Sequence, residues 1–285
     1  MSLFDTAATV MEGQMAYQRG VTLLEAKNIS LKFGDKLILR GINAKVEDLV
    51  RTGCITGQKV AFLGPSGIGK SQFLRILAGL QQPTTGEVLI TDKQIPVRKG
   101  LVGMVAQNHL LFRHRTVLSN LMVAAQHNCS RKEAKDKAIT MLQRFGIEAI
   151  ADQYPSQISG GQGQRVAIAQ QLLCSEHYLL MDEPFASLDP IATDLTCNLI
   201  AEVADQDEQN TIVVVTHDVR AALRVADTLW IIGRERDETG KFIPGATIFE
   251  PYDLIERGLA WHKDVELMPQ FHEIEREILD RIRRI

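Results

Sequence analysis

The hydrophobic and polar positions divide the chain into strand-like and helix-like stretches. Residues 1–20 have a helical tendency without clear turn signals, which indicates a frayed or docking helix. Residues 23–39 are strand-like on both sides of a Gly34-Asp35 turn. Antiparallel β-structure is therefore expected at the start of the fold.

Three later apolar runs lack polar positions almost entirely. They cover residues 59–63, 178–181 and 211–215, and they are typical of parallel strands that are buried on both faces. The first run leads through a glycine-rich segment into residues 72–80, whose apolar positions have helical spacing. This order of strand, loop and helix predicts an α/β sheet at the centre of the fold.

Two further segments have helical spacing, and one connection is unusually long. Residues 120–144 predict a mostly helical insertion, and residues 272–285 predict an amphipathic helix with i,i+4 ion pairs. Residues 45–56 lengthen the connection before the first apolar run, so we expect an extended hairpin or flap there. Such an insertion is tolerated at low cost, which favours a surface feature over a special role.

The composition is that of an ordinary globular protein. The 285 residues are 45% hydrophobic and 24% charged, and a net charge of -3 gives no reason to expect a nucleic-acid partner. The cysteines lack metal-ligand spacing, so we expect buried, reduced thiols at Cys54, Cys129, Cys174 and Cys197. No apolar stretch approaches the roughly 20 residues that a membrane span needs, so a partner must hold the chain at any membrane.

The glycine-rich segment after the first apolar run carries recognisable chemistry. Residues 64–71 match the pattern G-x-x-x-x-G-K-[ST] between a predicted strand and a predicted helix. In this pattern backbone N–H groups converge on phosphates, Lys70 reaches the outer phosphates and Ser71 offers a hydroxyl to Mg²⁺. The expected nucleotide-binding positions are Gly64, Pro65, Ser66, Gly67, Ile68, Gly69, Lys70, Ser71 and Gln72. Because all P-loop proteins share this loop, it does not separate a transporter ATPase from a kinase or a GTPase.

A second glycine-rich run is more specific. It reads Ile158-Ser159-Gly160-Gly161-Gln162 and opens another predicted helix, which places donors at the positive end of that helix. The run resembles the signature of ATP-binding cassette (ABC) proteins, usually L-S-G-G-Q, with a near-isosteric Ile in the first position. The resemblance extends from about residue 23 to about residue 251.

The motifs that follow the signature resemble the rest of the ABC pattern. Asp182 and Glu183 end an apolar strand, as in a Walker B motif, which implies that Asp182 holds Mg²⁺ through water and Glu183 orients the attacking water. Residues 186–189 resemble the D-loop and contribute Asp189. His217 resembles the switch histidine, which implies a contact with the γ-phosphate.

Two positions complete the set of expected site residues. Gln107 matches the Q-loop glutamine, which implies a bridge between Mg²⁺ and the helical insertion, and Phe33 matches the aromatic residue under adenine. The resemblance thus implies a catalytic group of Glu183, His217 and Lys70. It implies a metal group of Ser71, Gln107 and Asp182.

The resemblance also implies a fold and a domain division. The expected fold class is α/β, a P-loop NTPase core with an antiparallel β subdomain and a helical insertion subdomain. Residues 1–20 form an N-terminal extension, and residues 21–250 form the ABC ATPase domain, with the insertion at about 110–160. Residues 251–285 form a helical tail.

The implied function is that of an ATP-binding and ATP-hydrolysing transporter subunit, with ATP and Mg²⁺ as cofactors. Its implied partner is a second ABC ATPase subunit in a homodimer, each ATP lying between the P-loop of one copy and Ser159, Gly161 and Gln162 of the other. Closure of that dimer drives solute movement by transmembrane permease subunits, with a solute-binding protein if the system imports. The expected place is cytoplasmic, peripheral on the inner face of the membrane.

Residues 154–157 and 182–185 resemble ATPases of bacterial importers of the nitrate, sulfonate and polar amino acid groups. One departure from the family is Gln170-Gln171, where Arg and Ala are frequent. Two other readings remain open at this point. One is a soluble ABC ATPase that acts on DNA, ribosomes or Fe–S assembly, and the other is a P-loop kinase or GTPase.

Overall fold

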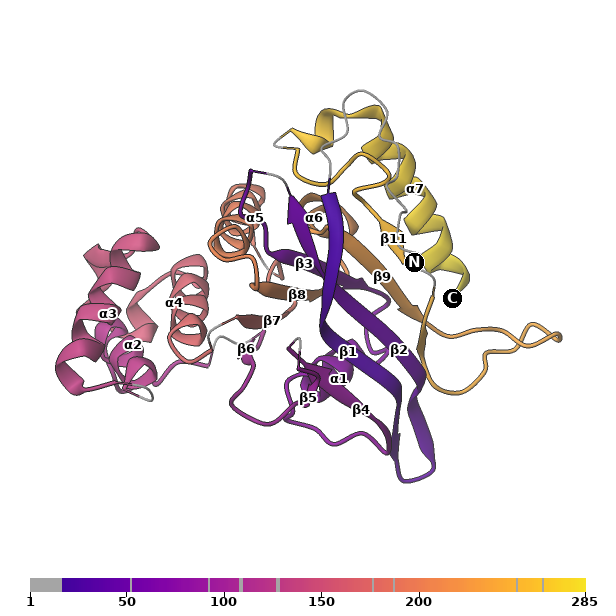
Figure 1. Cartoon of the computed structure of the whole chain (residues 1–285), viewed down its shortest axis with the longest axis horizontal. Coiled ribbons are helices and arrows are strands. Elements are labelled where there is room, and N and C mark those ends of the chain that lie inside the picture. The colour runs from indigo at the N-terminus through magenta and orange to yellow at the C-terminus, as the bar shows by residue number, and fades with distance from the viewer. Residues whose placement is uncertain are drawn as a thin grey trace, which may run out of the picture.

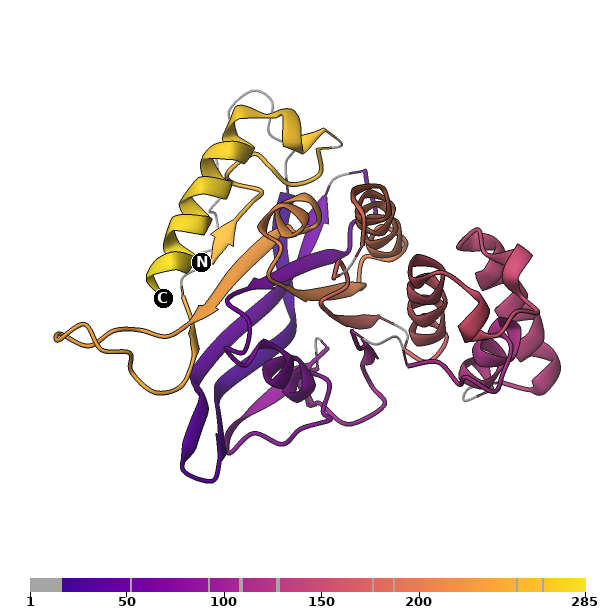
Figure 2. The same cartoon turned by 180° about the vertical axis from the view of Figure 1, so that it is seen from behind.

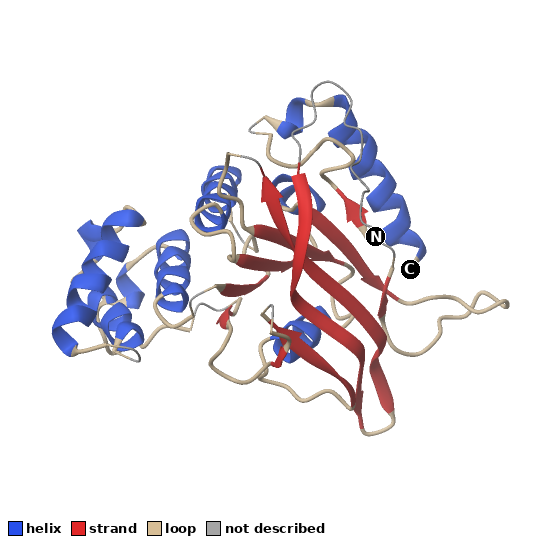
Figure 3. Ribbon diagram, in the orientation of Figure 1, coloured by secondary structure: helices blue, strands red, loops and turns tan. Residues whose placement is uncertain are grey.

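The computed structural model describes residues 17–51, 53–91, 93–107, 110–126, 129–175, 177–186, 188–249, 251–262 and 264–285. Two β-sheets and three groups of helices make up this part of the chain (Figure 1, Figure 3). The antiparallel sheet has the strand order β2-β1-β4-β5, and the central sheet has the order β10-β9-β3-β8-β7-β6, with β11 paired to β9. The predicted α/β fold class is confirmed.

The central sheet is parallel in its main part because helical crossovers separate its strands. Its strands are β3 (Gln58–Leu63), β6 (Gly103–Val105), β7 (Tyr178–Asp182), β8 (Thr211–Thr216), β9 (Thr228–Gly233), β10 (Thr247–Ile248) and β11 (Tyr252–Asp253). Every residue of β3 and β8 is buried, as their apolar runs predict. Strand β3 pairs in parallel with both β8 and β9, so the glycine-rich loop leaves the middle of the sheet.

The antiparallel sheet covers one face of the central sheet. Its strands are β1 (Tyr17–Phe33), β2 (Lys36–Arg51), β4 (Thr85–Ile90) and β5 (Ile95–Pro96). Helix α1 (Lys70–Leu77) lies in the same core, where Phe62 stacks on Trp230 at 5.0 Å between ring centroids and meets Phe73 edge-on at 5.2 Å. This core fixes the helix that follows the glycine-rich loop.

A helical group stands apart from α1 at the β6 end of the central sheet (Figure 1). It contains α2 (Val117–Ala125), α3 (Arg131–Arg144) and α4 (Gly160–Leu172), with the short turns η1 (Glu148–Ile150) and η2 (Pro155–Gln157) between the last two. Helix α5 (Pro190–Ala204) shares a core with this group and with β7 and β8. The helical group therefore packs directly against the strand that ends in Asp182.

The C-terminal part covers the other face of the sheet. Helices α6 (Val219–Val225) and α7 (Pro269–Arg284), with η3 (Val265–Leu267) between them, bury their apolar side chains against β3 and β9. Figure 2 shows α7 beside β9 and β11, on the side of the molecule away from α2 and α3. The predicted C-terminal helix is present, but the segment after residue 251 begins as strand β11 and belongs to the central sheet.

The expectation of a helix over residues 1–20 is wrong for residues 17–20, the part of this range that the structure describes. Residues 17–20 form the start of β1, with Tyr17 opposite Arg51, and residues 1–16 lie outside the described residues. A strand forms here because the partner strand β2 continues to Arg51. The long connection at residues 45–56 thus extends the β1-β2 hairpin, as predicted, and residues 17–20 of β1 pair with its end.

This hairpin extension docks on the C-terminal segment. The Tyr17 ring meets the edge of Trp261 at 6.0 Å between centroids, and the Arg51 guanidinium lies 4.1 Å from the Trp261 ring centroid. Arg19 forms an ion pair with Asp253 of β11. Two segments more than 200 residues apart in the chain therefore stabilise each other.

The four cysteines are free thiols, but their exposure is not uniform. Cys197 is buried, Cys129 and Cys174 are half-buried, and Cys54 is exposed. Burial raises the pKa of Cys197 to about 12, so this thiol stays protonated at neutral pH. The prediction of buried thiols is wrong for Cys54, because it follows the end of β2 in the exposed hairpin.

In the part of the chain that the structure describes, no helix combines the length and the apolar character needed to cross a bilayer.

Candidate functional site

The glycine-rich loop, residues 64–71, has the backbone shape of a phosphate cradle. A Cβ atom on Gly64 would lie 2.3 Å from the carbonyl oxygen of Ile232, so only glycine fits beside β9. Gly67 and Gly69 have φ values of 75° and 114°, which L side chains rarely adopt. The loop can therefore curl tightly between β3 and the N-terminus of α1, and its N–H groups can face an anion.

Lys70 is held in place inside this loop. Its Nζ atom donates hydrogen bonds to the carbonyl oxygens of Gly64 at 2.8 Å and of Pro65 at 3.2 Å, and it lies 3.6 Å from Oε1 of Glu183. Burial lowers the pKa of Lys70, while the charge of Glu183 opposes that shift. The result is a cation at the base of the loop, 3.6 Å from the carboxylate of the residue that follows β7.

Ser71 and Asp182 bring two oxygens together at the start of α1. The Ser71 Oγ atom donates a hydrogen bond of 3.0 Å to Oδ1 of Asp182, the last residue of β7. Burial raises the pKa of Asp182, and the hydrogen bond from Ser71 partly offsets this shift. A hard cation favours such oxygen ligands.

Glu183 is fixed by an unusual backbone and by three donors. Its φ is 50°, and its N–H donates to the carbonyl of Val215 at 2.7 Å. Its Oε2 atom accepts hydrogen bonds from the Thr216 hydroxyl, from the backbone N–H of His217 and from Nδ1 of His217 at 2.8 Å. The adjacent parallel strands β7 and β8 end side by side, which brings Glu183 and His217 together. The predicted group of Lys70, Glu183 and His217 is thus a single cluster of side chains.

The residues from Ser159 to Gln162 lie elsewhere, at the start of α4 in the helical group. Ser159 and Gln162 form a capping box, in which the Ser159 hydroxyl accepts from the Gln162 N–H at 3.2 Å and the Gln162 Oε1 accepts from the Ser159 N–H at 2.9 Å. Cβ atoms on Gly160 and Gly161 would meet nothing within 4 Å. The start of α4 is therefore an open surface, and no contact between it and the Lys70 cluster appears among the described residues.

The other predicted positions occupy loop ends. Phe33 ends β1 and is 50% exposed, so its ring is available for stacking. Gln107 is exposed just after β6. Asp189 caps α5 by accepting a hydrogen bond of 2.8 Å from the Ala192 N–H, and its D-loop neighbour Ser187 lies outside the described residues.

Comparisons with known proteins give this arrangement its family. A family model described as "ABC transporter" matches residues 49–186. The probable ABC transporter ATP-binding protein PEB1C of Campylobacter jejuni is 35% identical over 215 residues, covering 73% of this chain and 85% of that protein. The arginine transport ATP-binding protein ArtP of Haemophilus influenzae is 37% identical over 217 residues, covering 71% of this chain and 85% of that protein.

The chain belongs to the ABC transporter family.

A solved structure supports the same conclusion. The ATP-binding cassette MJ0796, in a dimeric post-hydrolysis state bound to ADP and Pi, has a TM-score of 0.65 and 26% identity over 81% of this chain and 99% of its own. The chain is thus an ABC ATPase subunit that binds and hydrolyses ATP for a transporter. These relatives favour that function over a soluble ABC ATPase outside transport, and over a kinase or GTPase.

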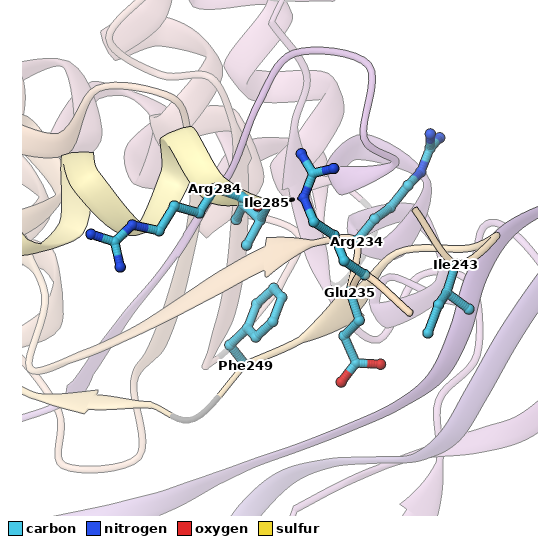
Figure 4. A pocket seen from close by; sticks show the side chains of 7 residues that line it. Arg234, Glu235, Ile243, Phe249, Arg284 and Ile285 are labelled. Carbon is cyan, nitrogen blue, oxygen red and sulfur yellow. Dashed lines mark hydrogen bonds between the residues drawn. The ribbon is translucent and has the colours of Figure 1, made fainter. Parts of the chain in front are cut away.

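One pocket in the described part of this ABC ATPase lies away from the predicted ATP site. It encloses about 520 Å³ between β9 and the end of α7 and contains none of the predicted site residues. Figure 4 shows Ile285 beside Phe249 and Arg234 there.

Gln170-Gln171 depart from the ABC pattern, and one of these two residues, Gln171, has a structural role. The Gln171 Oε1 atom accepts a hydrogen bond of 3.1 Å from the backbone N–H of Met104. Met104 lies in β6, the edge strand of the central sheet, which leads to Gln107. Gln171 therefore ties α4 to the strand before the Q-loop.

Sequence reasoning missed two residues of the site. Thr216 donates to Oε2 of Glu183, the predicted catalytic carboxylate, and Gln164 connects α4 with the chain beside Glu183. Thr216 is next to the predicted switch histidine, so its position at a strand end was the available signal. Gln164 follows the signature by two positions, and nothing in the sequence shows where its side chain points.

The Asp182→Asn variant is expected to melt higher than wild type by about 2–4 °C without nucleotide at neutral pH. Because the folded-state pKa of Asp182 is raised, the folded protein holds this proton more tightly than the unfolded chain does. The ionised carboxylate therefore lowers stability at neutral pH, and this cost is relieved as the pH falls through the raised pKa. Calorimetry at lower pH should show a smaller difference in Tm between the variant and wild type. The variant should not hydrolyse ATP. A variant that melts below wild type contradicts this prediction.

Proposed function

We propose that this subunit works as one half of a head-to-tail dimer, with each ATP held between two copies of the chain. The observation that carries the proposal is the separation of the site residues. Lys70, Ser71, Asp182 and Glu183 meet in one cluster, whereas the donors at the start of α4 face open space in a separate helical group. ATP favours the closed dimer because only there are its phosphates held from both sides.

Mg²⁺ fits the Ser71 and Asp182 oxygens in this proposal. The described residues contain no group of three or more His, Cys, Asp or Glu side chains that could hold a metal. Mg²⁺ in phosphate sites needs only one or two protein oxygens, because phosphates and water supply the rest. Bound there, Mg²⁺ supplies charge neutralisation to phosphoryl transfer, with Gln107 as a further ligand.

Three residues of the chain have different roles in ATP hydrolysis. Lys70 stabilises charge on the transferred phosphoryl group, and Glu183 orients the attacking water as its proton acceptor. His217 Nδ1 is held 2.8 Å from Glu183 Oε2, so a shift of either side chain moves the other. Through this hydrogen bond, a contact of His217 with the γ-phosphate changes the position of the Glu183 carboxylate.

The physiological role that we propose is solute import, with the subunit on the cytoplasmic face of the membrane. The support is the kind of relative that the chain matches, since one is named for arginine transport. Exposed apolar side chains at Leu110 and Phe112, 77% and 44% exposed at the edge of the helical group, offer a surface for a helix of a permease subunit. A homodimer, two permease subunits and a solute-binding protein make up the proposed system.

Three measurements test the parts of the proposal separately. Light scattering with ATP and Mg²⁺ should show a dimer that disappears with ADP, and omission of Mg²⁺ should abolish hydrolysis. Affinity purification from detergent-solubilised membranes should recover a polytopic membrane protein. A chain that hydrolyses ATP as a monomer contradicts the dimer, and one that purifies without any membrane protein but is stimulated by nucleic acid contradicts the transport role.

A further inference from the structure

Gln164 makes a single directed contact out of α4. Its side chain is buried, with a relative exposure of 1%, and Nε2 donates a hydrogen bond to the carbonyl oxygen of Pro184. Its Oε1 atom is buried and has no hydrogen-bond partner among the described residues. The amide is therefore oriented by Pro184 alone, because the opposite orientation would place two acceptors against each other.

Pro184 is the residue after Glu183, whose backbone needs external support. A glutamate with a φ of 50° is uncommon, and such a conformation persists only where its surroundings fix it. The N–H of Glu183 is held by Val215, and the carbonyl of Glu183 accepts from the Ala186 N–H at 3.1 Å. The carbonyl of Pro184 is its sole backbone hydrogen-bonding group, because proline has no N–H, and Gln164 holds it.

Gln164 and the signature residues belong to the same rigid element. Ser159 caps α4, and Gln164 lies about 7 Å further along the axis at the rise of an α-helix. A displacement of the start of α4 therefore moves Gln164 by a similar distance. The hydrogen bond from Gln164 then leads to Pro184, next to Glu183 of the same subunit.

We propose that Gln164 is a positioning residue that couples the two ATP sites of the dimer. The inference rests on the proposed head-to-tail dimer, in which one subunit gives the start of α4 to one ATP and Glu183 to the other. ATP at the first site shifts α4, and Gln164 re-aims Glu183 at the second site through the carbonyl of Pro184. Since coupling between binding sites is reciprocal, ATP bound at either site favours the hydrolysis-competent position of Glu183 at the other.

The Gln164→Met variant tests the coupling. Met is similar in size and shape to Gln but has no N–H donor. We expect the hydrolysis rate at saturating ATP to fall about tenfold, and the Hill coefficient for ATP to fall from well above 1 to about 1. We expect only a small fall in Tm, because removal of the buried, unpartnered Oε1 atom partly offsets the loss of the donor to the carbonyl of Pro184. The matched control is Gln170→Met on the same helix, at a half-buried position whose side chain has no hydrogen bond within the described residues, and it should behave as wild type.

The possible results separate the coupling from the dimer. A Gln164→Met protein with the wild-type Hill coefficient overturns the coupling, and so does a slower protein whose Tm falls while its Hill coefficient is kept, since that marks a structural role. A wild-type dimer with a Hill coefficient of 1 also overturns the coupling. A wild-type protein that hydrolyses ATP without dimerising overturns the proposed dimer instead. If Gln164→Met does not fold, Gln164→Asn is measured with the same expectation, because its amide is one methylene too short to reach Pro184.

Discussion

The Glu183→Gln variant is expected to bind ATP as wild type does and to hydrolyse it about 10³-fold more slowly. The glutamine has the shape of the glutamate, but its neutral amide cannot take a proton from the attacking water. ATP binding should survive because the P-loop and Lys70 are unchanged in position, with the Lys70 amine still bonded to Gly64 and Pro65. The pre-hydrolysis dimer should therefore accumulate.

Phosphate release, fluorescent-nucleotide binding and light scattering with ATP and Mg²⁺ measure the three parts of this result. The matched control is Glu238→Gln, which removes an exposed carboxylate from the loop after β9. That control should hydrolyse ATP at the wild-type rate, and its dimer should disappear, as that of wild type does, once the ATP has been hydrolysed to ADP. Hydrolysis by Glu183→Gln within tenfold of wild type would show that another group activates the water.

The Gly161→Asp variant is expected to fold as well as wild type and to lose at least about 10²-fold in ATP hydrolysis. A Cβ atom at Gly161 would meet nothing within 4 Å, so the substitution causes no clash inside the subunit. A carboxylate in the first turn of α4 even stabilises the helix through its dipole. In the dimer, however, the same carboxylate faces the phosphates that the partner binds, and like charges repel.

Calorimetry, steady-state hydrolysis and light scattering together decide this case. The expected combination is an equal or higher Tm, slow hydrolysis and no ATP-dependent dimer. The control Lys132→Asp places the same side chain at the second position of α3, another helix of the same group, where the residue is exposed. It should leave hydrolysis unchanged. Normal hydrolysis by Gly161→Asp would mean that the start of α4 does not contact ATP, whereas a large drop in Tm would mean that it is needed inside the subunit.

Much of the ATP site follows from the sequence because its residues act through local backbone structure. In any P-loop the glycine-rich segment joins a strand to a helix, as residues 64–71 do here, so spacing and context predict the roles of Lys70 and Ser71. Glu183 and His217 follow two apolar runs, and the ends of adjacent parallel strands meet at one edge of the sheet. Their proximity could thus be expected, although the hydrogen bond between them could not.

Tertiary structure decided the features that depend on distant partners. Residues 17–20 have a helical tendency on their own, but pairing with the end of β2 makes them a strand, because tertiary hydrogen bonds and packing outweigh weak local propensity. The same reason explains why the C-terminal segment joins the central sheet through β11 before it becomes a helix.

The sequence by itself determined the family resemblance and the α/β class, and it predicted the phosphate-binding and catalytic residues, because each of these residues lies in a short motif whose chemistry is local. Only the tertiary structure decided which of these residues meet within one chain. It joined Lys70 and Ser71 of one motif to Glu183 and Asp182 of another, and it left the signature residues on a separate helix. It also directed the side chain of Gln164 toward Pro184, because a side chain's contacts depend on what packs against its helix and not on its position in the chain.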